Sequence, residues 1–491
     1  MLSNGKTKIV NLLIILLLVV SSVYLVNNYM SYSSYFNETG KVLGVYGLTS
    51  VAILGIMILL ILVLYFKIHA FIALIIGSIM VGIGTGMDFK SIIMAIQNGM
   101  GSTLGSVATI VGLGAIFGEM LEASGGAQAL SKKLIQTFGK EKASWALMLT
   151  GFLVAIPVFF DVGFIILIPL VYSLAKESKK SVIYYGIPLL AGLAVTHTFI
   201  PPTPGPVAVA AIIGADLGWV IFLGAIVGLP TAIISGPVWG SIIGKKIYVN
   251  PEDFIEENEE KVEKIPSFKK VITVIAVPLV MILLNTVLTT LVGSGIIEKS
   301  IVTDFIEFLG NPFVALTIST LIAFYVLGIK EGFSKEMILN LSNKAFGPIG
   351  LVILVTGAGG IFKQILVDSG IGTLLANTMA NSNLPIIVLA FLVAGIVRVS
   401  QGSATVAMIT AAGIVAPILD VVQVSAPGKA LLVISIASGA TILSHVNDSG
   451  FWLVGRYFGL DVKDTFRSWT VMETLVGGCG FIFSLILSFI L

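Results

Sequence analysis

Residues 143–174 read ASWALMLTGFLVAIPVFFDVGFIILIPLVYSL, an apolar run that lies between two lysine-rich segments. Cytoplasmic loops of membrane proteins collect Lys and Arg, so both ends of this run are expected on the cytoplasmic side. Pro157, Asp161 and Gly163 interrupt the run and leave arms of about 13 residues, whereas a spanning helix needs about 20. We therefore predict a re-entrant helical hairpin whose tip is formed by residues 157–163.

The composition of the whole chain agrees with a membrane protein. Of its 491 residues, 56% are hydrophobic and only 11% are charged. Soluble proteins carry about 25% charged residues, so most of this surface is expected to face lipid. A net charge of +2 argues against a nucleic-acid partner. Three histidines and one cysteine make a dedicated metal site unexpected, and we expect no cofactor.

Motifs of known enzymes are also missing from the sequence. Neither the phosphate-binding motif G-x-x-x-x-G-K-[ST] nor the zinc motif H-E-x-x-H occurs. Because no catalytic constellation is visible, we predict that the protein is not an enzyme.

Apolar run lengths and basic loops together predict eleven spans and two hairpins, with the N-terminus cytoplasmic and the C-terminus outside. The first span, residues 9–26, is read as a retained signal anchor, with a cleaved signal peptide as the alternative. A second hairpin, within residues 385–419, enters from outside with its tip at residues 398–405. Two further spans are broken, at residues 197–206 and 444–450, where Pro, Gly and polar residues interrupt apolar sequence.

An internal repeat divides the chain into two halves. GLGAIFGEMLEASG at residues 112–125 resembles GAGGIFKQILVDSG at residues 357–370, an offset of 245 residues. The same offset relates Gly205 to Gly450, residue 214 to residue 459, and Asp216 to Asp461. Each half has five spans and one hairpin, and an odd number of spans inserts the halves upside down relative to each other. Inverted repeats with broken helices are typical of secondary transporters.

The predicted organisation therefore has four parts. Residues 1–41 form an extra N-terminal anchor and external loop, and residues 42–246 form the first transport repeat. Residues 247–270 form a charged cytoplasmic linker, and residues 271–491 form the second, inverted repeat. The fold class is an all-α integral membrane protein of the secondary-transporter kind.

The four breaks are expected to hold the solute, because irregular backbone at membrane depth is tolerated only inside protein or along a cavity. Half-helix N-termini at such breaks attract anions. Arg398 is suited to bind a carboxylate, with an internal salt bridge as the alternative. Hydroxyl groups are expected either to bind a polyol or to cap helices. The candidate substrate-binding residues are Asp161, His197, Thr203, Gly205, Arg398, Gln401, Ser403, Thr405, Ser444 and Asn447.

Titratable groups inside a membrane are functional candidates by default. Asp161, His197, His445 and Asp448 all fall in the predicted breaks and are candidates to carry a coupling proton. For each of them the alternative is a structural role, as a helix cap or as a buried group bonded to backbone.

The breaks also carry a family resemblance. THTFIPPTPGPVAVAAIIGADLG (196–218), VRVSQGSATVAMITAAGIVAP (397–417) and SHVNDSGFWLVGRYFGL (444–460) resemble the gluconate permease family, and FFDVGFIILIPLV (159–171) fits as well. The resemblance extends from about Val42 to the C-terminus. One departure is Thr203, which stands where the family often has His, so a role of that side chain in proton coupling or substrate choice is in doubt. The N-terminal span is also extra.

The resemblance implies a bacterial inner-membrane carrier that takes up gluconate or another small hydroxy-carboxylate with protons. It also implies an elevator motion of hairpin-bearing domains against a scaffold, and a homodimer. Three alternatives stay open. The same scaffold could carry glycerate, D-serine or another organic anion; it could couple to sodium or exchange anions; or the protein could be a passive facilitator. Discrete polar tips rather than a continuous polar lining argue against a channel.

Overall fold

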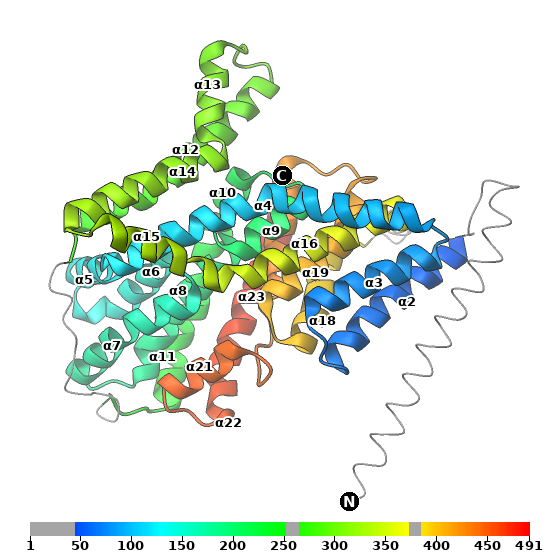
Figure 1. The fold of residues 1–491 in the computed structure, drawn as a ribbon. Helices are drawn as coiled ribbons and strands as arrows, with labels where there is room; N and C mark the ends of the chain where they lie inside the picture. Colours follow the sequence, from blue (N-terminus) through cyan, green and yellow to red (C-terminus); the bar gives the residue numbers. More distant parts are fainter. Residues whose placement is uncertain (1–44, 252–264, 373–383) are drawn as a thin grey trace, which may run out of the picture. The chain divides into compact units, whose positions relative to one another are not determined.

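The computed structural model describes residues 45–251, 265–372 and 384–491, which form helices and connections with no β-strand among them (Figure 1). The predicted N-terminal span and much of the predicted linker lie outside these residues. The α-helices of the first half are α2 (Val45–Leu64), α3 (Ala70–Gly84), α4 (Phe89–Ala123), α5 (Gly126–Phe138), α6 (Ala143–Val154), α7 (Phe160–Ser178), α8 (Val182–Phe199), α9 (Pro204–Ile213), α10 (Leu217–Ile233) and α11 (Trp239–Lys246).

The second half continues the helical pattern. Its α-helices are α12 (Phe268–Gly293), α13 (Ile301–Gly310), α14 (Pro312–Ala323), α15 (Lys335–Lys344), α16 (Phe346–Asp368), α18 (Ile386–Gln401), α19 (Ala404–Leu419), α20 (Ala426–Gly439), α21 (Ser449–Tyr457), α22 (Val462–Thr465) and α23 (Val471–Ser488). Short π-helical turns, η2 (Ile234–Val238), η4 (Phe324–Gly328) and η6 (Phe466–Thr470), join or extend some of them.

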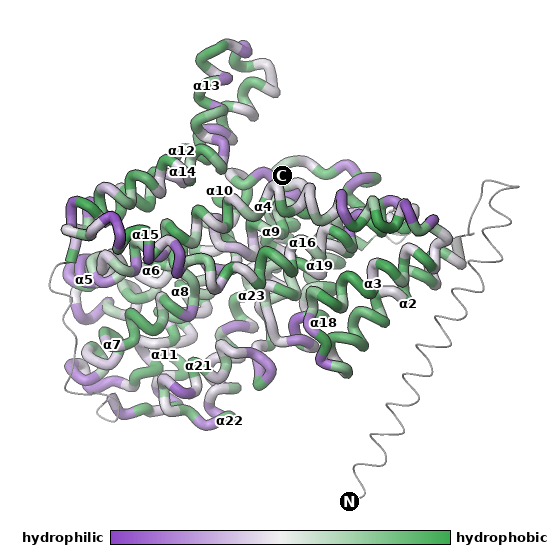
Figure 2. The backbone as a smooth tube through the Cα atoms, in the orientation of Figure 1, coloured by the Kyte–Doolittle hydropathy of each residue, from purple (hydrophilic) through white to green (hydrophobic). Residues whose placement is uncertain are grey.

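Seven helical segments of the described chain are long and apolar enough to cross a membrane. They are residues 89–123, 182–213, 217–246, 268–293, 312–331, 335–368 and 462–488. Shorter apolar helices accompany them, and Figure 2 shows hydrophobic residues along the helices and hydrophilic residues concentrated near helix ends and connections. A multi-pass membrane protein is therefore confirmed.

The chain is helical at several places where apolar run lengths predict only loops. The lysine-rich segment before residue 143 contains α5, whose inner face buries Ala127, Leu130 and Leu134. Helix α4 begins at Phe89, well before the continuous apolar stretch in its second half. Both differences have one cause: an amphipathic helix buries one face only, so its average hydropathy stays low although its periodicity supports a helix.

The contact pattern divides the chain into two compact units. Unit 1 contains residues 1–104, 354–384 and 413–423. Within it, α4 and α16 approach closely at Gly99 and Gly360, where a side chain on either residue would overlap the other helix. Unit 2 contains residues 105–353, 385–412 and 424–491.

Within unit 2, α6 packs tightly on α8, and α18 packs tightly on α20. Gly151 of α6 faces the backbone of α8, and Gly192 of α8 faces the backbone of α6. In the second half, Gly439 of α20 faces the backbone of α18 at Phe391. Glycine is needed at these positions because a β-carbon would overlap the neighbouring backbone.

Local conformations agree with the 245-residue offset of the repeat. The glycines at 125 and 370 both adopt positive φ, at 74° and 76°, and those at 214 and 459 do so at 68° and 60°. Asp216 caps α10 by accepting from the amide of Trp219, and Asp461 caps α22 by accepting from the amide of Asp464. Equivalent positions in the two halves therefore end and begin helices in the same way.

Candidate functional site

Helices are interrupted within all four predicted breaks. The interruptions are Ala155–Phe159 between α6 and α7, Ile200–Thr203 between α8 and α9, Gly402–Ser403 between α18 and α19, and Ala440–Asp448 between α20 and α21. Proline or glycine, which do not continue a helix readily, occurs in the first three of them, whereas residues 440–448 contain neither. The breaks at residues 200–203 and 402–403 are narrower than predicted, the first break begins and ends earlier than predicted, and the fourth begins at Ala440 rather than at Ser444. Asp161 therefore lies in the first turn of α7 and Arg398 in the last turn of α18.

All four breaks lie in unit 2, and side-chain contacts join them. The ring of Phe159, before α7, lies 6.1 Å from that of His197, at the end of α8. A β-carbon on Gly205 would lie 2.9 Å from the sulfur of Met408, so α9 meets α19 at their first turns. The rings of Phe164 in α7 and Tyr457 in α21 lie 5.5 Å apart, which connects these two helices. Tertiary packing has therefore brought the four breaks into one region.

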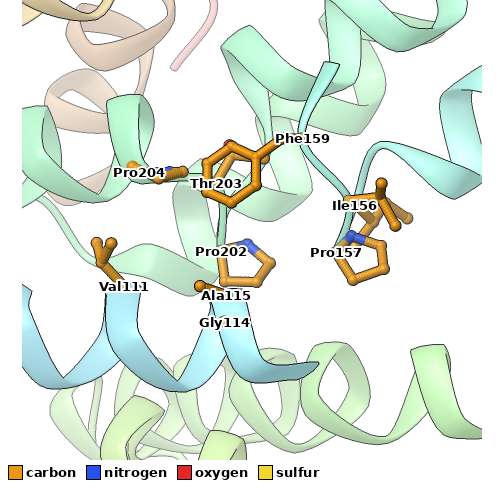
Figure 3. A pocket seen from close by; sticks show the side chains of 10 residues that line it. Val111, Gly114, Ala115, Ile156, Pro157, Phe159, Pro202, Thr203 and Pro204 are labelled. Atoms are coloured by element: carbon orange, nitrogen blue, oxygen red, sulfur yellow. The ribbon is translucent and has the colours of Figure 1, made fainter. Parts of the chain in front are cut away.

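A small, mostly apolar cavity lies between the first two breaks (Figure 3). Its volume is about 10 Å³, the lower limit for one water molecule. Pro157 and Phe159 line it from one break, Pro202 and Thr203 from the other, and Gly114 from α4. Thr203 is 5% exposed, and its hydroxyl donates to the carbonyl of Ile200 at 2.8 Å. This half of the site is closely packed.

The N-terminus of α9 presents very few amides. Its first three residues are Pro204, Gly205 and Pro206, and the N-cap Thr203 makes no side-chain hydrogen bond to the helix. Because proline has no N–H, Gly205 supplies the only amide donor among the three. The N-terminus of α7 differs, since its first turn contains no proline and its N-cap Phe159 has no capping side chain.

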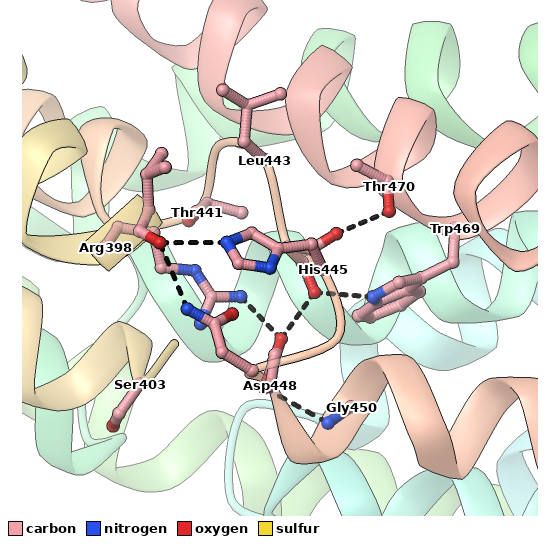
Figure 4. A network of polar contacts seen from close by, with 12 residues as sticks. Arg398, Ser403, Thr441, Leu443, His445, Asp448, Gly450, Trp469 and Thr470 are labelled. Carbon is pink, nitrogen blue, oxygen red and sulfur yellow. Dashed lines mark hydrogen bonds and ion pairs between the residues drawn. The ribbon is translucent and has the colours of Figure 1, made fainter. Parts of the chain in front are cut away.

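An ion pair lies at the centre of the other half of the site (Figure 4). Nη2 of Arg398 lies 2.5 Å from Oδ2 of Asp448, and the two side chains are 2% and 14% exposed. Asp448 is also the N-cap of α21 and accepts from the amide of Gly450 at 3.1 Å. The internal salt bridge, one of the two roles considered for Arg398, is therefore present in this conformation.

His445 and Asn447 complete the end of α18. Nε2 of His445 donates to the carbonyl of Val399 at 2.8 Å, and Nδ2 of the Asn447 side chain donates to the same oxygen at 3.0 Å. A helix leaves its last carbonyls without internal partners, and these two side chains satisfy one of them. The α20–α21 connection is thus attached to the end of α18 by a charge pair and two hydrogen bonds.

Ser444 anchors the same connection to η6. Its hydroxyl donates to Oδ2 of Asp448 at 2.5 Å and accepts from Nε1 of Trp469 at 2.7 Å. Its carbonyl accepts from the hydroxyl of Thr470. Ser444 is 1% exposed, so in this conformation its polar groups are used inside the protein.

The remaining candidates differ in accessibility. Asp161, Ser403 and Asn447 are exposed, and Gln401 and Thr405 are partly exposed. Ser403 makes a long hydrogen bond, 3.4 Å, from the amide of Val406 in α19. The structure therefore separates the candidates into an accessible set and a buried set. The buried set is Thr203, Gly205, Arg398 and Ser444.

Two residues of this region are absent from the sequence-based candidates. Trp469 bonds Ser444 and packs on the ring of Phe160 at 5.5 Å. Glu473, in the first turn of α23, is 5% exposed and interacts electrostatically with Arg398 and Asp448. Glu473 could have been chosen as a candidate from the sequence, because it is an acidic residue inside an apolar span. For Trp469 there was no signal, because tryptophan is common near membrane interfaces.

The known proteins that this chain resembles in sequence are permeases and transporters. The family model described as GntP family permease matches residues 47–490. A gluconate permease of Pseudomonas aeruginosa is 41% identical over 90% of this chain and 97% of its own length. The Gnt-II system L-idonate transporter of Escherichia coli is 40% identical over 87% of this chain and 95% of its own length. A gluconate permease of Bacillus subtilis is 37% identical over 89% and 98% of the two chains.

Solved structures show the same kind of fold at low sequence identity. The YdaH transporter of Alcanivorax borkumensis superposes with a TM-score of 0.56 at 14% identity, over 82% of this chain and 90% of its own. MtrF of Neisseria gonorrhoeae superposes with a TM-score of 0.55 at 14% identity, over 81% and 85% of the two chains. Both similarities concern the fold alone.

Proposed function

The chain belongs to the GntP family of permeases, and from that premise we propose that it takes up gluconate or a related sugar acid across the bacterial cytoplasmic membrane together with protons. The substrate class is supported by relatives named gluconate permeases and an L-idonate transporter. Since these are transporters, the protein is not an enzyme.

One structural observation carries the proposal: the four helix breaks meet in a single region of a membrane protein. The first turns of α7, α9, α19 and α21 all begin there, and helix N-termini carry partial positive charge. Prolines leave few free amides at the start of α9, and Asp448 caps α21. A carboxylate is the ligand that such helix ends attract. The exposed Ser403 and Asn447 supply polar groups for substrate hydroxyls, with Gln401 and Thr405 beside them.

The charges of the site support coupling to protons. Asp161 is accessible and interacts with Asp448, so an arriving organic anion meets two carboxylates. Like charges at close range repel each other strongly where water is scarce. Protonation of one carboxylate removes that repulsion, so binding of the anion and binding of a proton favour each other. Asp161, His197, His445 and Asp448 are the candidates that the sequence supplies for this proton.

The proposal extends to how the chain lies in the membrane. The basic loops support a cytoplasmic N-terminus and an external C-terminus. The matched glycines and helix caps at the 245-residue offset support an inverted repeat with two re-entrant hairpins. An elevator motion and a homodimer follow from the family resemblance and belong to the same proposal.

The test is uptake of labelled D-gluconate into proteoliposomes that contain the purified protein, with an inward proton gradient and no sodium. We expect accumulation that collapses when an uncoupler is added. Uptake that needs sodium or internal anion would replace the proton by another coupling ion, and equilibration without accumulation would indicate a passive facilitator. If gluconate does not move, L-idonate, glycerate and D-serine are the next substrates to test.

A further inference from the structure

Glu473 is a buried carboxyl group without a hydrogen-bond partner. It is 5% exposed, and its Oε1 is buried with no hydrogen bond. An ionised carboxylate in such a place costs several kcal/mol unless a positive group pairs with it. Glu473 must therefore be neutral or find a cation.

Arg398 is the cation within reach. Helix α18 packs on α23 through the stacked rings of Phe391 and Phe481, whose centroids are 4.2 Å apart. Arg398 follows Phe391 by seven residues, and Glu473 precedes Phe481 by eight, so antiparallel helices place the two charged residues at the same end. The electrostatic interaction between Glu473 and Arg398 agrees with this placement.

Arg398 has spare capacity for a second carboxylate. Only Nη2 is paired, with Asp448, whereas Nε and Nη1 are buried without hydrogen-bond partners. A guanidinium group offers five N–H donors in a fixed plane, enough for two carboxylates. One positive charge cannot neutralise two negative charges, however, so Asp448 and Glu473 compete for it.

Other titratable groups near α23 do not change this balance. Helix α10 has no titratable residue. Helix α20 carries only Lys429, which lies in its first turn, whereas the α20–α21 connection follows its other end at Gly439. Helix α8 carries Tyr184 and Tyr185 in its first turn and His197 in its last. Arg467 of η6 is 59% exposed and pairs with Asp464, and His445 bonds the carbonyl of Val399. Asp161 acts on Asp448 from α7 and adds negative charge. The group thus holds one cation and an excess of carboxylates.

We infer that Glu473 binds and releases the coupled proton, and that it does so by competing with Asp448 for the guanidinium group of Arg398. With its proton, Glu473 is neutral and Arg398 pairs with Asp448, as in this structure. When the proton leaves, the carboxylate of Glu473 accepts from the free nitrogens of Arg398 and weakens the Arg398–Asp448 pair.

The element that responds is the α20–α21 connection. Asp448 caps α21 and bonds Ser444, and Ser444 bonds Trp469, so a change at Asp448 reaches both the helix start and the tryptophan. Exposed Asn447 belongs to the same connection. Proton release at Glu473 therefore alters the surface that the proposed function assigns to the substrate. The inference rests on that function being proton-coupled transport.

The first experiment compares wild type, Glu473→Gln and Glu119→Gln in proteoliposomes. Glu119 is a matched control, because its carboxylate pairs with Lys344 at 2.7 Å and takes no part in the Arg398 pair. A gradient of about two pH units supports about a 100-fold accumulation for one proton per solute. We expect that accumulation in wild type and Glu119→Gln, and a ratio of about one in Glu473→Gln.

Exchange of gluconate between equal pools at equal pH shows whether the variant still carries solute. Glu473→Gln is expected to keep this exchange, but without the pH dependence of wild type. Accumulation in Glu473→Gln equal to wild type would overturn the inference and leave the proposed function intact. Failure of wild type to accumulate any sugar acid would instead count against the proposed function.

A second measurement uses wild type and does not depend on the substrate. The fluorescence of Trp469 is expected to titrate between about pH 4 and about pH 10 in the purified protein, because Glu473 changes the bonding of Ser444. Trp469→Phe identifies the signal by removing it, and Glu473→Gln is expected to abolish its pH dependence. A flat wild-type signal, or an unchanged titration in Glu473→Gln, would overturn the inference.

Discussion

The break between α8 and α9 and the break between α20 and α21 lie 245 residues apart, the offset of the sequence repeat, yet they are built differently. The first is short, contains Pro201 and Pro202, is followed directly by Pro204 at the start of α9, and is buried throughout. The second is longer, partly exposed, and held by an ion pair and side-chain hydrogen bonds. The comparison indicates that one half of the site provides a packed wall and the other provides charges that can change partners.

Removing the ion pair should have the largest effect on this comparison. Arg398→Ala leaves the carboxylate of Asp448 buried without its partner, which costs about 3–5 kcal/mol. We expect a large fall in thermal stability in detergent and loss of gradient-driven accumulation. Asp448→Asn should also abolish accumulation.

Lys140→Ala is the control for this prediction, because the Lys140–Glu177 pair is 75% and 54% exposed and contributes at most about 1 kcal/mol. If Arg398→Ala has the same thermal stability and the same accumulation as Lys140→Ala, the α20–α21 half of the site does not depend on the Arg398–Asp448 pair.

Gly402→Ala should have the next largest effect, since it tests how the second hairpin meets the α20–α21 connection. Gly402 has a φ of 88°, where other residues are strained by about 1–3 kcal/mol, and its β-carbon would overlap the backbone of Asn447. We expect reduced thermal stability and reduced transport. Gly350→Ala is the control, because Gly350 lies within α16 with open space around it. Equal stability of both variants would show that the close approach is unimportant.

A pair of hydroxyl variants compares the two breaks directly. Ser444→Ala removes a bond to a charged acceptor and is expected to cost about 1.5–3 kcal/mol. Thr203→Val removes a bond to a carbonyl and is expected to cost about 0.5–1.5 kcal/mol. Thermal unfolding in detergent measures both. A larger loss of stability in Thr203→Val than in Ser444→Ala would mean that the packed α8–α9 break, rather than the charged α20–α21 break, depends more on its hydroxyl hydrogen bond.

Asn447→Ala should have the smallest effect on stability, because His445 still donates to the carbonyl of Val399. We expect a loss of less than about 1 kcal/mol. If the accessible amide also binds substrate, KM for gluconate rises about tenfold, the equivalent of about 1.4 kcal/mol, with kcat little changed. Asn340→Ala, an exposed change on α15, is the control. An unchanged KM would remove Asn447 from the proposed site.

Much of the fold follows from the sequence because its causes are local. Long apolar runs predict membrane helices, and Pro157, Pro201 and Gly402 fall in interruptions that the structure confirms. Amphipathic helices such as α5 and α15 were not predicted, since hydropathy averaged over a window hides one-sided periodicity. The sequence repeat could also be found without the structure, because glycines with positive φ and Asp helix caps recur 245 residues apart.

The site could be predicted in its residues but not in its partnerships. The sequence identified Arg398, Asp448 and Ser444 because polar groups in apolar segments are rare and costly. Only the tertiary structure decided that Arg398 pairs with Asp448, that Ser444 is used internally, and that Glu473 is buried with an oxygen that has no hydrogen-bond partner. The physical reason is range: a helix break is determined by neighbours in the chain, whereas a charge pair depends on the distance between segments that only packing brings together.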